Sequence, residues 1–473
     1  MLRAGTAHGN RKMKLRAHIV AACGLSLAAQ AVFGADLVEV YQRALQNDPI
    51  IREADANRLA SRESKPQALA SLLPQLEASG GYSKDNEEFS RIQPQRISPD
   101  SPDVIFVPVT TDSDSDGYQW AIQLRQTLFR WDQWATLKRA DAEVAQAEAD
   151  FQAAQQELIQ RTAQRYFDVL AAQDTVDAAQ ATLEAFSRQL EQADKRFEVG
   201  LIAITDVQES RAAHDQAAAA VIQAKRNLAT AQELLRELTG EPFDKLAAPS
   251  ADMPLKTPDP ENEDQWVSTA LEQNLRIISA RLATDIAKQD VRVARSGHLP
   301  AFDLVASRRD FDYTGTSVAD DGSRSPSDRT QTTDSIGIQV TFPIYSGGAT
   351  SSRVRQRVYL HRAARERLER TARETERAAR DAYLGVLSEI SRVRALRQAL
   401  ESSRTALQAT EAGFEVGTRT TVDVLDARRR LFEAQTNYSR SRYDYILNVL
   451  QLQLATGTLA VADLEEINTL LEE

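Results

Sequence analysis

The segment FEVGLIAITDVQ…LTG (residues 197–240) recurs in this chain as FEVGTRTTVDVL…ATG (residues 414–457). The two segments align without a gap, with Phe197 opposite Phe414 and Gly240 opposite Gly457, and 11 of their 44 aligned pairs are identical. The identities cluster at the two ends, where Phe-Glu-Val-Gly opens each copy and Thr-Gly closes it. A repeat of so long a period indicates the duplication of a whole structural unit rather than a solenoid.

The duplication extends upstream of this segment. A second run of identities is found where Ala44, Leu45, Ile51, Ala54, Ala68, Leu73 and Pro74 match Ala270, Leu271, Ile277, Ala280, Ala294, Leu299 and Pro300. Further along, Ile122 and Gln123 match Ile338 and Gln339. The spacing between matched residues shortens between these two places, which puts ten extra residues in the first copy, between Pro74 and Ile122.

The N-terminus has the pattern of an export signal. Lys12, Lys14 and Arg16 precede a largely apolar stretch at residues 19–33, and we expect cleavage after Gly34. Met13 is a plausible start, because it gives a signal of ordinary length. Removal of residues 1–34 takes away five of 57 basic residues and none of 68 acidic ones, which leaves 52 against 68 and a formal charge of -16. No later apolar run approaches the ~20 residues that a membrane helix needs.

Cys23 is the only cysteine and falls inside the expected signal. The mature chain therefore has no thiol for a disulfide, a metal or a nucleophile. The run Val-Ala-Ala-Cys at residues 20–23 loosely resembles a lipoprotein cleavage site, so lipidation at Cys23 is an alternative. Cleavage there would leave the apolar residues 25–32 after the cut, which favours the ordinary export signal.

The helical pattern has three parts in each copy. Small or apolar residues recur in steps of three and four through residues 207–238 and 424–455, which predicts heptad seams between closely packed helices. Proline-free stretches at 135–199 and 350–416 precede the seams and predict rods of about 95 Å, at ~1.5 Å per residue. The stretches at 37–72 and 264–298 are near half that length. We expect two half-length helices, stacked end to end, beside each long one.

Each Leu-Pro pair, at Pro74 and Pro300, ends a helix and begins a pattern of period two. Apolar and polar residues alternate at 119–125 and 336–342, which predicts strands with one apolar and one polar face. Shorter partner strands are expected to begin at the prolines. Polar segments at about 84–117 and 314–334 are expected to be exposed, mobile loops.

Four strands per chain favour an oligomeric outer-membrane barrel. Four strands cannot close a barrel, and lipid does not tolerate open sheet edges. Two chains would give eight strands and a filled barrel, whereas three would give twelve strands and a lumen, so we favour the trimer. A soluble protein with small hairpins capping a coiled coil is the alternative, but it leaves the export signal and the apolar faces unexplained.

The expected fold class is mixed and mostly α, with an internal duplication. Its order is an export signal at 1–34, a helix at 35–73, a strand pair with an external loop at 74–130, long coiled-coil helices at 131–240, an equatorial linker at 241–263, a helix at 264–299, a second strand pair with an external loop at 300–346, long helices at 347–457 and an equatorial segment at 458–473.

The motifs GLIAITDVQ (200–208), VGTRTTVDVLDA (416–427), GHLP (297–300) and FPIYSGG (342–348) together resemble the TolC family of outer-membrane export ducts. The resemblance covers essentially the whole mature chain. It implies a homotrimer embedded in the lipid of the outer membrane of a Gram-negative bacterium, with a twelve-strand barrel that continues into a periplasmic tunnel of twelve helices.

The resemblance also implies a function and partners. The channel would be passive and gated at its periplasmic end, and it would export drugs, other small molecules or type I secretion substrates. Its partners would be a periplasmic adaptor protein and an inner-membrane ABC or proton-driven transporter. A periplasmic coiled-coil adaptor without a pore is the alternative function.

The resemblance places the closed-entrance contacts at Thr205 and Asp206 on one helical hairpin and at Arg419 on the other. An arginine that faces an aspartate and a hydroxyl suits a latch that a partner protein can open, because each contact at a wet tunnel mouth is worth no more than ~1 kcal/mol. The family has a tyrosine where this chain has Phe414, so one closing contact lacks its hydroxyl. Without the resemblance, ordinary surface charges beside a turn would explain Arg419 and Asp206 equally well.

Asp423 and Asp426 match the family's aspartate ring at the narrowest point of the tunnel. They lie three residues apart and share a helix face. Threefold symmetry would gather six carboxylates, which raises some of their pKa values and predicts cation selectivity and block by multivalent cations. The equivalent residues of the first copy, Asp206 and Glu209, are acidic too. The alternative is that the two acids simply stabilise the start of the helix through their interaction with the helix dipole.

The turns Val199-Gly200-Leu201 and Val416-Gly417-Thr418 match the tips that meet the adaptor in the family. Helix termination by glycine is the alternative role, and both roles can hold together.

Enzyme and nucleic-acid functions are not expected. The sequence has no Walker phosphate loop, no dinucleotide fingerprint and no His-Glu-x-x-His motif, and its five histidines are scattered, so no cofactor or metal is expected. The mature chain is acidic, and its arginine-rich stretch at 362–380 is interleaved with glutamate as on a solvated helix face.

Overall fold

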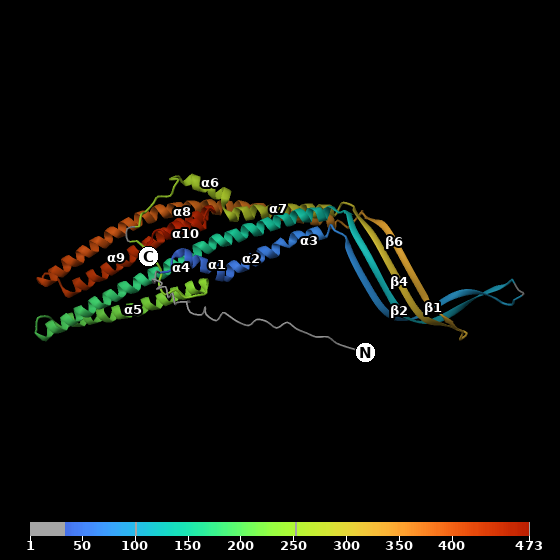
Figure 1. The fold of residues 1–473 in the computed structure, drawn as a ribbon, viewed down its shortest axis with the longest axis horizontal. Helices are drawn as coiled ribbons and strands as arrows, with labels where there is room; N and C mark the ends of the chain where they lie inside the picture. Colours follow the sequence, from blue (N-terminus) through green and yellow to red (C-terminus); the bar gives the residue numbers. More distant parts are fainter. Residues whose placement is uncertain (1–33, 100–101, 251–252, 473) are drawn as a thin grey trace, which may run out of the picture.

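The computed structural model describes residues 34–99, 102–250 and 253–472. The expected export signal, with Met13 and Cys23, lies outside the described residues apart from Gly34. Figure 1 shows an elongated molecule with its long strands at one end and two helical hairpins that reach the other end. Within the described residues, none of the helices is both long and apolar enough to cross a membrane.

Four long antiparallel strands form the sheet, in the order β1-β2-β4-β6. They are β1 (Gln75–Arg96), β2 (Val104–Phe129), β4 (Ala301–Ala319) and β6 (Arg329–Thr341), and the short β5 (Arg324–Pro326) pairs with the far end of β4. These are the four strands that the sequence predicts. Among the described residues, β1 and β6 each have one edge without a partner strand.

The strands run further than the sequence predicts. β1 and β2 pair continuously from Gln75↔Arg125 to Arg96↔Val104, so most of the expected loop at 84–117 consists of paired strands. β4 and β6 likewise take up much of the expected loop at 314–334. The polar composition was misleading, because hydroxyls and carboxylates pair across strands as readily as apolar groups, as when Thr332 donates to Asp310 at 2.6 Å.

The two faces of the sheet differ as expected. One cross-strand row contains Leu124, Ala306 and Ile336, and the neighbouring row on the opposite face contains Gln123, Ser307 and Ser335. The apolar face is open to its surroundings in a single chain: Ile336 is 78% and Ile338 64% exposed. An apolar face of this extent marks a surface that contacts lipid or another protein.

The long helices agree closely with their predicted bounds. They are α4 (Trp131–Glu198) and α8 (Ala349–Glu415), followed by the seam helices α5 (Ile204–Thr239) and α9 (Thr421–Thr456). Every predicted seam position is buried or half-buried. Gly240 and Gly457 end the seam helices with φ values of 77° and 80°, a left-handed conformation that glycine adopts without strain.

The half-length helices are broken, which corrects the prediction of continuous ones. The first consists of α1 (Leu37–Asn47), α2 (Pro49–Arg62) and α3 (Ser64–Ala70), and the second of α6 (Glu263–Gln273) and α7 (Leu275–Ser296). Asp48 caps α2, which begins with Pro49, and Asn274 caps α7. A side-chain cap starts a new helix at each site, and proline at the first helical position is compatible with the cap.

The predicted end-to-end stacking is confirmed. α2 and α3 pack on the half of α4 nearest the strands, α5 packs on the other half, and α7 lies between α4 and α8 (Figure 1). The seam helix α9 contacts α8, α4 and α5, so the α8/α9 hairpin lies against the α4/α5 hairpin.

The largest cluster of buried hydrophobic residues lies midway along the helices. Tyr166, Phe167 and Tyr443 are buried there, and the Phe167 and Tyr443 rings stack at 5.6 Å. The Tyr166 hydroxyl donates to the Ala247 carbonyl at 2.6 Å. The equatorial segments meet at this level, where β3 (Ala248–Pro249) pairs with β7 (Leu471–Glu472) beside α10 (Val461–Asn468). Burial raises the pKa of both tyrosines above the ordinary value.

Candidate gate at the hairpin tips

Both hairpins turn at the end of the molecule that lies farthest from the strands (Figure 1). Gly200 and Gly417 have φ values of 76° and 78°, so each supplies a left-handed turn residue. A Cβ at either position would have no atom within 4 Å, so the backbone conformation, and not a lack of space, favours glycine there. The reversal is fixed by backbone bonds from Leu201 N to Arg196 O at 2.9 Å and from Thr418 N to Gly413 O at 2.8 Å. The helix-terminating role predicted for the glycines is confirmed.

The tips are unusually apolar for exposed turns. Val199, Leu201 and Val416 are 69%, 73% and 76% exposed. Thr418 differs, because its hydroxyl donates to the Gly413 carbonyl at 3.0 Å and stabilises the turn. Apolar residues gathered on an exposed tip are typical of a surface that meets a protein partner.

Arg419 is exposed and its stem folds back over α8. Its backbone N–H donates to the Gly413 carbonyl at 3.2 Å, and a Cβ placed on Gly413 would lie 2.7 Å from the Arg419 Cγ. A larger residue at 413 would therefore displace Arg419. The observed position of Arg419 therefore requires glycine at position 413.

Thr205 and Asp206 lie in the first turn of α5, on the other tip. Within the described residues of one chain, no hydrogen bond or ion pair joins Arg419 to Thr205 or to Asp206. A single chain thus presents both halves of the predicted latch without bringing them together.

Phe414 lies in the last turn of α8 and is half-buried. The guanidinium carbon of Arg196, in the last turn of α4, lies 5.0 Å from the centre of the Phe414 ring. This geometry is that of a cation–π contact. Phe414 therefore has a partner on the other hairpin even though it lacks a hydroxyl.

Asp423 forms a capping box at the start of α9 with Thr420, the N-cap residue. Its carboxylate accepts from the Thr420 N–H and hydroxyl, both at 2.9 Å, and its own N–H donates to the Thr420 hydroxyl oxygen at 3.2 Å. The Thr420 bonds, with a smaller contribution from the Arg419 charge, hold the pKa of Asp423 below its ordinary value. The helix-capping role is thus present, whatever further role the carboxylate has.

Asp426 lies one turn further along α9 and is half-buried. Arg429 lies 3.3 Å from it on the same helix. The equivalent start of α5 has Ala203 in place of Thr420 and no side-chain cap. The two copies thus share their acidic residues here but not the capping arrangement.

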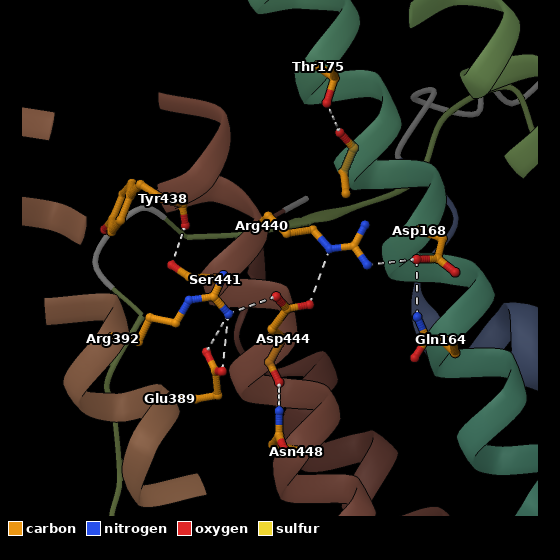
Figure 2. A network of polar contacts seen from close by, with 11 residues as sticks. Gln164, Asp168, Thr175, Glu389, Arg392, Tyr438, Arg440, Ser441, Asp444 and Asn448 are labelled. Carbon is orange, nitrogen blue, oxygen red and sulfur yellow. Dashed lines mark hydrogen bonds and ion pairs between the residues drawn. The ribbon is translucent and has the colours of Figure 1, made fainter. Parts of the chain in front are cut away.

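A polar network joins the two hairpins, as Figure 2 shows. Its residue on α4, Asp168, precedes the end of that helix at Glu198 by 30 residues. Arg440 of α9 lies 3.5 Å from Asp168 of α4 and 3.2 Å from Asp444. Arg392 of α8 lies 3.5 Å from Asp444 and 3.2 Å from Glu389. The network links α4, α9 and α8 in one continuous chain of charges.

Comparison with known proteins identifies the class. The family model described as "Outer membrane efflux protein" matches residues 40–241 and 266–458, which are the two copies of the repeat. The chain belongs to this outer membrane efflux protein family. It is therefore a channel for efflux or secretion in the outer membrane of a Gram-negative bacterium.

Relatives and solved structures agree with this assignment. The efflux-family chain is 35% identical to "Outer membrane protein TolC" of Vibrio cholerae over 456 residues, which cover 96% of this chain and 98% of the relative. It is 29% identical to "Alkaline protease secretion protein AprF" of Pseudomonas aeruginosa, over 93% and 88% of the two chains. Its fold matches the Campylobacter jejuni CmeC outer membrane channel with a TM-score of 0.71 at 18% identity, over 93% and 90%.

Three residues at the efflux channel's tips were not predicted from the sequence: Arg196, Gly413 and Thr420. Thr420 and Asp423 have the spacing of a capping box, so that pair was detectable. Arg196 and Gly413 occupy the same position of the two repeats, and their difference was visible in the alignment. Only the structure shows which residues Arg196 and Gly413 contact.

Proposed function

We propose that three copies of this chain form one channel, with a twelve-strand barrel in the membrane and a helical tunnel below it. One observation carries the proposal: the described part of each chain forms a four-stranded sheet with two open edges and an exposed apolar face. Lipid requires those edges to be paired, and twelve strands are enough to leave a lumen. The channel-family assignment supports the same arrangement.

The number of chains per particle tests this proposal. We expect native mass spectrometry of the detergent-purified protein to give three chains. A particle of two chains would mean a closed eight-strand barrel without a wide lumen, and a stable monomer would contradict the paired edges.

The exposed tips are proposed to dock a periplasmic adaptor protein, which would couple the channel to an inner-membrane ABC or proton-driven transporter. The apolar Val199, Leu201 and Val416 support this placement. One relative is named as a secretion protein for an alkaline protease and the matching family as an efflux family, so the proposed cargo includes both secreted proteins and small molecules such as drugs. The alternative, an adaptor without a pore, leaves the apolar sheet face without a role.

Asp423 and Asp426 are proposed to form the selectivity ring. Both lie on the first turns of α9, next to the tip, where three chains would converge around one axis. The capping bonds of Asp423 support the ring, because they fix the position of the carboxylate and keep it charged.

The cation preference of the ring is expected to depend on pH. Thr420→Val removes the hydroxyl donor, so the pKa of Asp423 rises toward its ordinary value. A carboxylate with a lowered pKa stays charged until the pH falls through that pKa, so the variant loses part of its cation preference at a higher pH than the wild type. The reversal potential of the channel, measured at successively lower pH, checks this. Identical acid profiles would contradict it.

We propose that Arg419 latches the entrance by reaching Thr205 and Asp206 of a neighbouring chain, since no such contact forms between the described residues of one chain. Each contact at a wet entrance is worth up to ~1 kcal/mol, so its loss changes the closed-to-open ratio up to about fivefold. Arg419→Ser is therefore expected to raise the mean single-channel conductance. Arg404→Ser, which removes an arginine that pairs with Glu401 within its own helix, is the control. Equal conductance of wild type and Arg419→Ser would place the latch elsewhere.

A further inference from the structure

The two copies of the repeat differ most informatively at their tips. Position 196 is arginine and its counterpart 413 is glycine, whereas Ile202 in the first copy corresponds to Arg419 in the second. Each copy thus has one arginine at its tip, which precedes the turn in the first copy and follows it in the second. Duplicated hairpins with the same backbone therefore present different contacts.

Arg196 is placed to join the two hairpins of one chain. It belongs to the last turn of α4, and its guanidinium lies over the ring of Phe414 in the last turn of α8. The reciprocal contact cannot form, because Phe197 would need a cation at position 413, where the residue is Gly413. Of the two equivalent contacts that the repeat would allow, only the one between Arg196 and Phe414 can therefore form.

The same two hairpins are held together at a second level. Asp168 and Asp174 of α4 bind Arg440 and Tyr443 of α9, at 3.5 Å and 2.8 Å (Figure 2 shows the first pair). From residue 174 to residue 196 the α4 helix runs for roughly 33 Å, at ~1.5 Å per residue.

Between these two levels the hairpins meet through apolar side chains. One cluster contains Phe186, Ala213, Ala217 and Leu425, and another contains Val176, Ala179, Val221 and Ala224 with Phe432 packed against it. Apolar contacts of this kind are not directional. The polar network can therefore fix one end of the pair while the other end depends on the tip contact.

We propose that Arg196 and Phe414 form a clasp that holds the two hairpin tips of each chain together in the closed entrance. This inference rests on the proposed gated trimer. The polar network around Arg440 is the fixed end, and the clasp is the end that releases. Arg419 then acts between chains, so that alternate seams around the entrance are closed by different contacts.

The clasp predicts a specific mutational pattern in single-channel conductance. Arg196→Met and Phe414→Leu each remove the cation–π contact, and each puts a sizeable apolar side chain in its place. An exposed cation–π contact changes an equilibrium constant about two- to fivefold, so each variant is expected to raise the open-to-closed ratio by that factor per chain. The double variant is expected to equal either single one, because both remove the same contact. Phe414→Tyr retains a ring and is expected to stay closed.

Lys195→Met is the matched control. Lys195 is next to Arg196 and pairs with Glu191 on its own helix, so the variant removes the same charge from the same turn without touching the clasp. Unchanged conductance of Arg196→Met, equal effects of Lys195→Met and Arg196→Met, or additive single variants would each overturn the proposal.

A second readout is independent of any pore. Spin labels on Val199→Cys and Val416→Cys report the separation of the two tips within one chain, in particles diluted with unlabelled chains. Arg196→Met is expected to shift the distances to longer values, whereas Lys195→Met leaves them unchanged. If the wild type conducts no ions and Arg196→Met still shifts the distances, the proposed channel is overturned and the clasp stands. Identical distances in Arg196→Met and wild type would overturn the clasp alone.

Discussion

Replacement of both Asp423 and Asp426 by alanine is expected to abolish the cation preference of the channel and to relieve its block by multivalent cations. Three chains would gather six carboxylates around one axis, and their attractions for a cation add. Their removal is expected to weaken the affinity of a blocking divalent or trivalent cation by at least about tenfold. Reversal potentials in a salt gradient and titration of the block in planar bilayers measure both effects.

Two further variants separate charge from helix capping. Asp423→Asn with Asp426→Asn removes the charges and keeps the shape, and it is expected to behave like the alanine pair. Glu209→Ala changes the first-copy equivalent of Asp426, which lies on the other hairpin and outside the proposed latch, and is expected to leave most of the selectivity in place. If selectivity and block survive in both Asp423/Asp426 variants, the ring is not formed by these residues.

An arginine on the apolar face of the sheet is expected to prevent stable insertion. Ile338 is largely exposed and lies opposite Leu304, on the same face of the sheet as Ile336. An arginine that faces lipid costs up to about 2–4 kcal/mol, and three chains multiply that cost. We expect Ile338→Arg to give little heat-resistant oligomer in the outer-membrane fraction.

Gln339→Arg is the matched control, because it lies one residue away on the polar face, opposite the buried Asp303. A strand alternates its side chains between faces, so the same arginine would point into the lumen. We expect wild-type amounts of oligomer from this variant. Equal losses from both variants would mean that the two faces do not divide lipid from lumen.

Regular patterns were the part of the fold that could be predicted. The seam positions from Val207 to Leu238 are buried or half-buried as expected, because a three-four spacing fixes which face of a helix packs. The breaks at Asp48 and Asn274 were missed because one side-chain cap interrupts a helix without disturbing its hydrophobic period. The long polar ribbon beyond Ser83 was missed because backbone pairing, not composition, extends those strands.

The candidate site could be predicted only in part. The resemblance located Arg419, Asp423 and the tip glycines, and the structure places all of them beside the turns. Their roles in a latch and a ring stay predictions, since both need neighbouring chains. The stacking of Arg196 on Phe414 could not be read from the sequence, because it depends on how two hairpins from separate copies of the repeat pack together.

Single-channel recording of the purified wild-type protein in a planar bilayer is the decisive experiment on the proposed trimeric channel. We expect discrete channels of small conductance that prefer cations, from particles that contain three chains. Correctly folded protein that never conducts would contradict the channel and would favour a periplasmic adaptor without a pore.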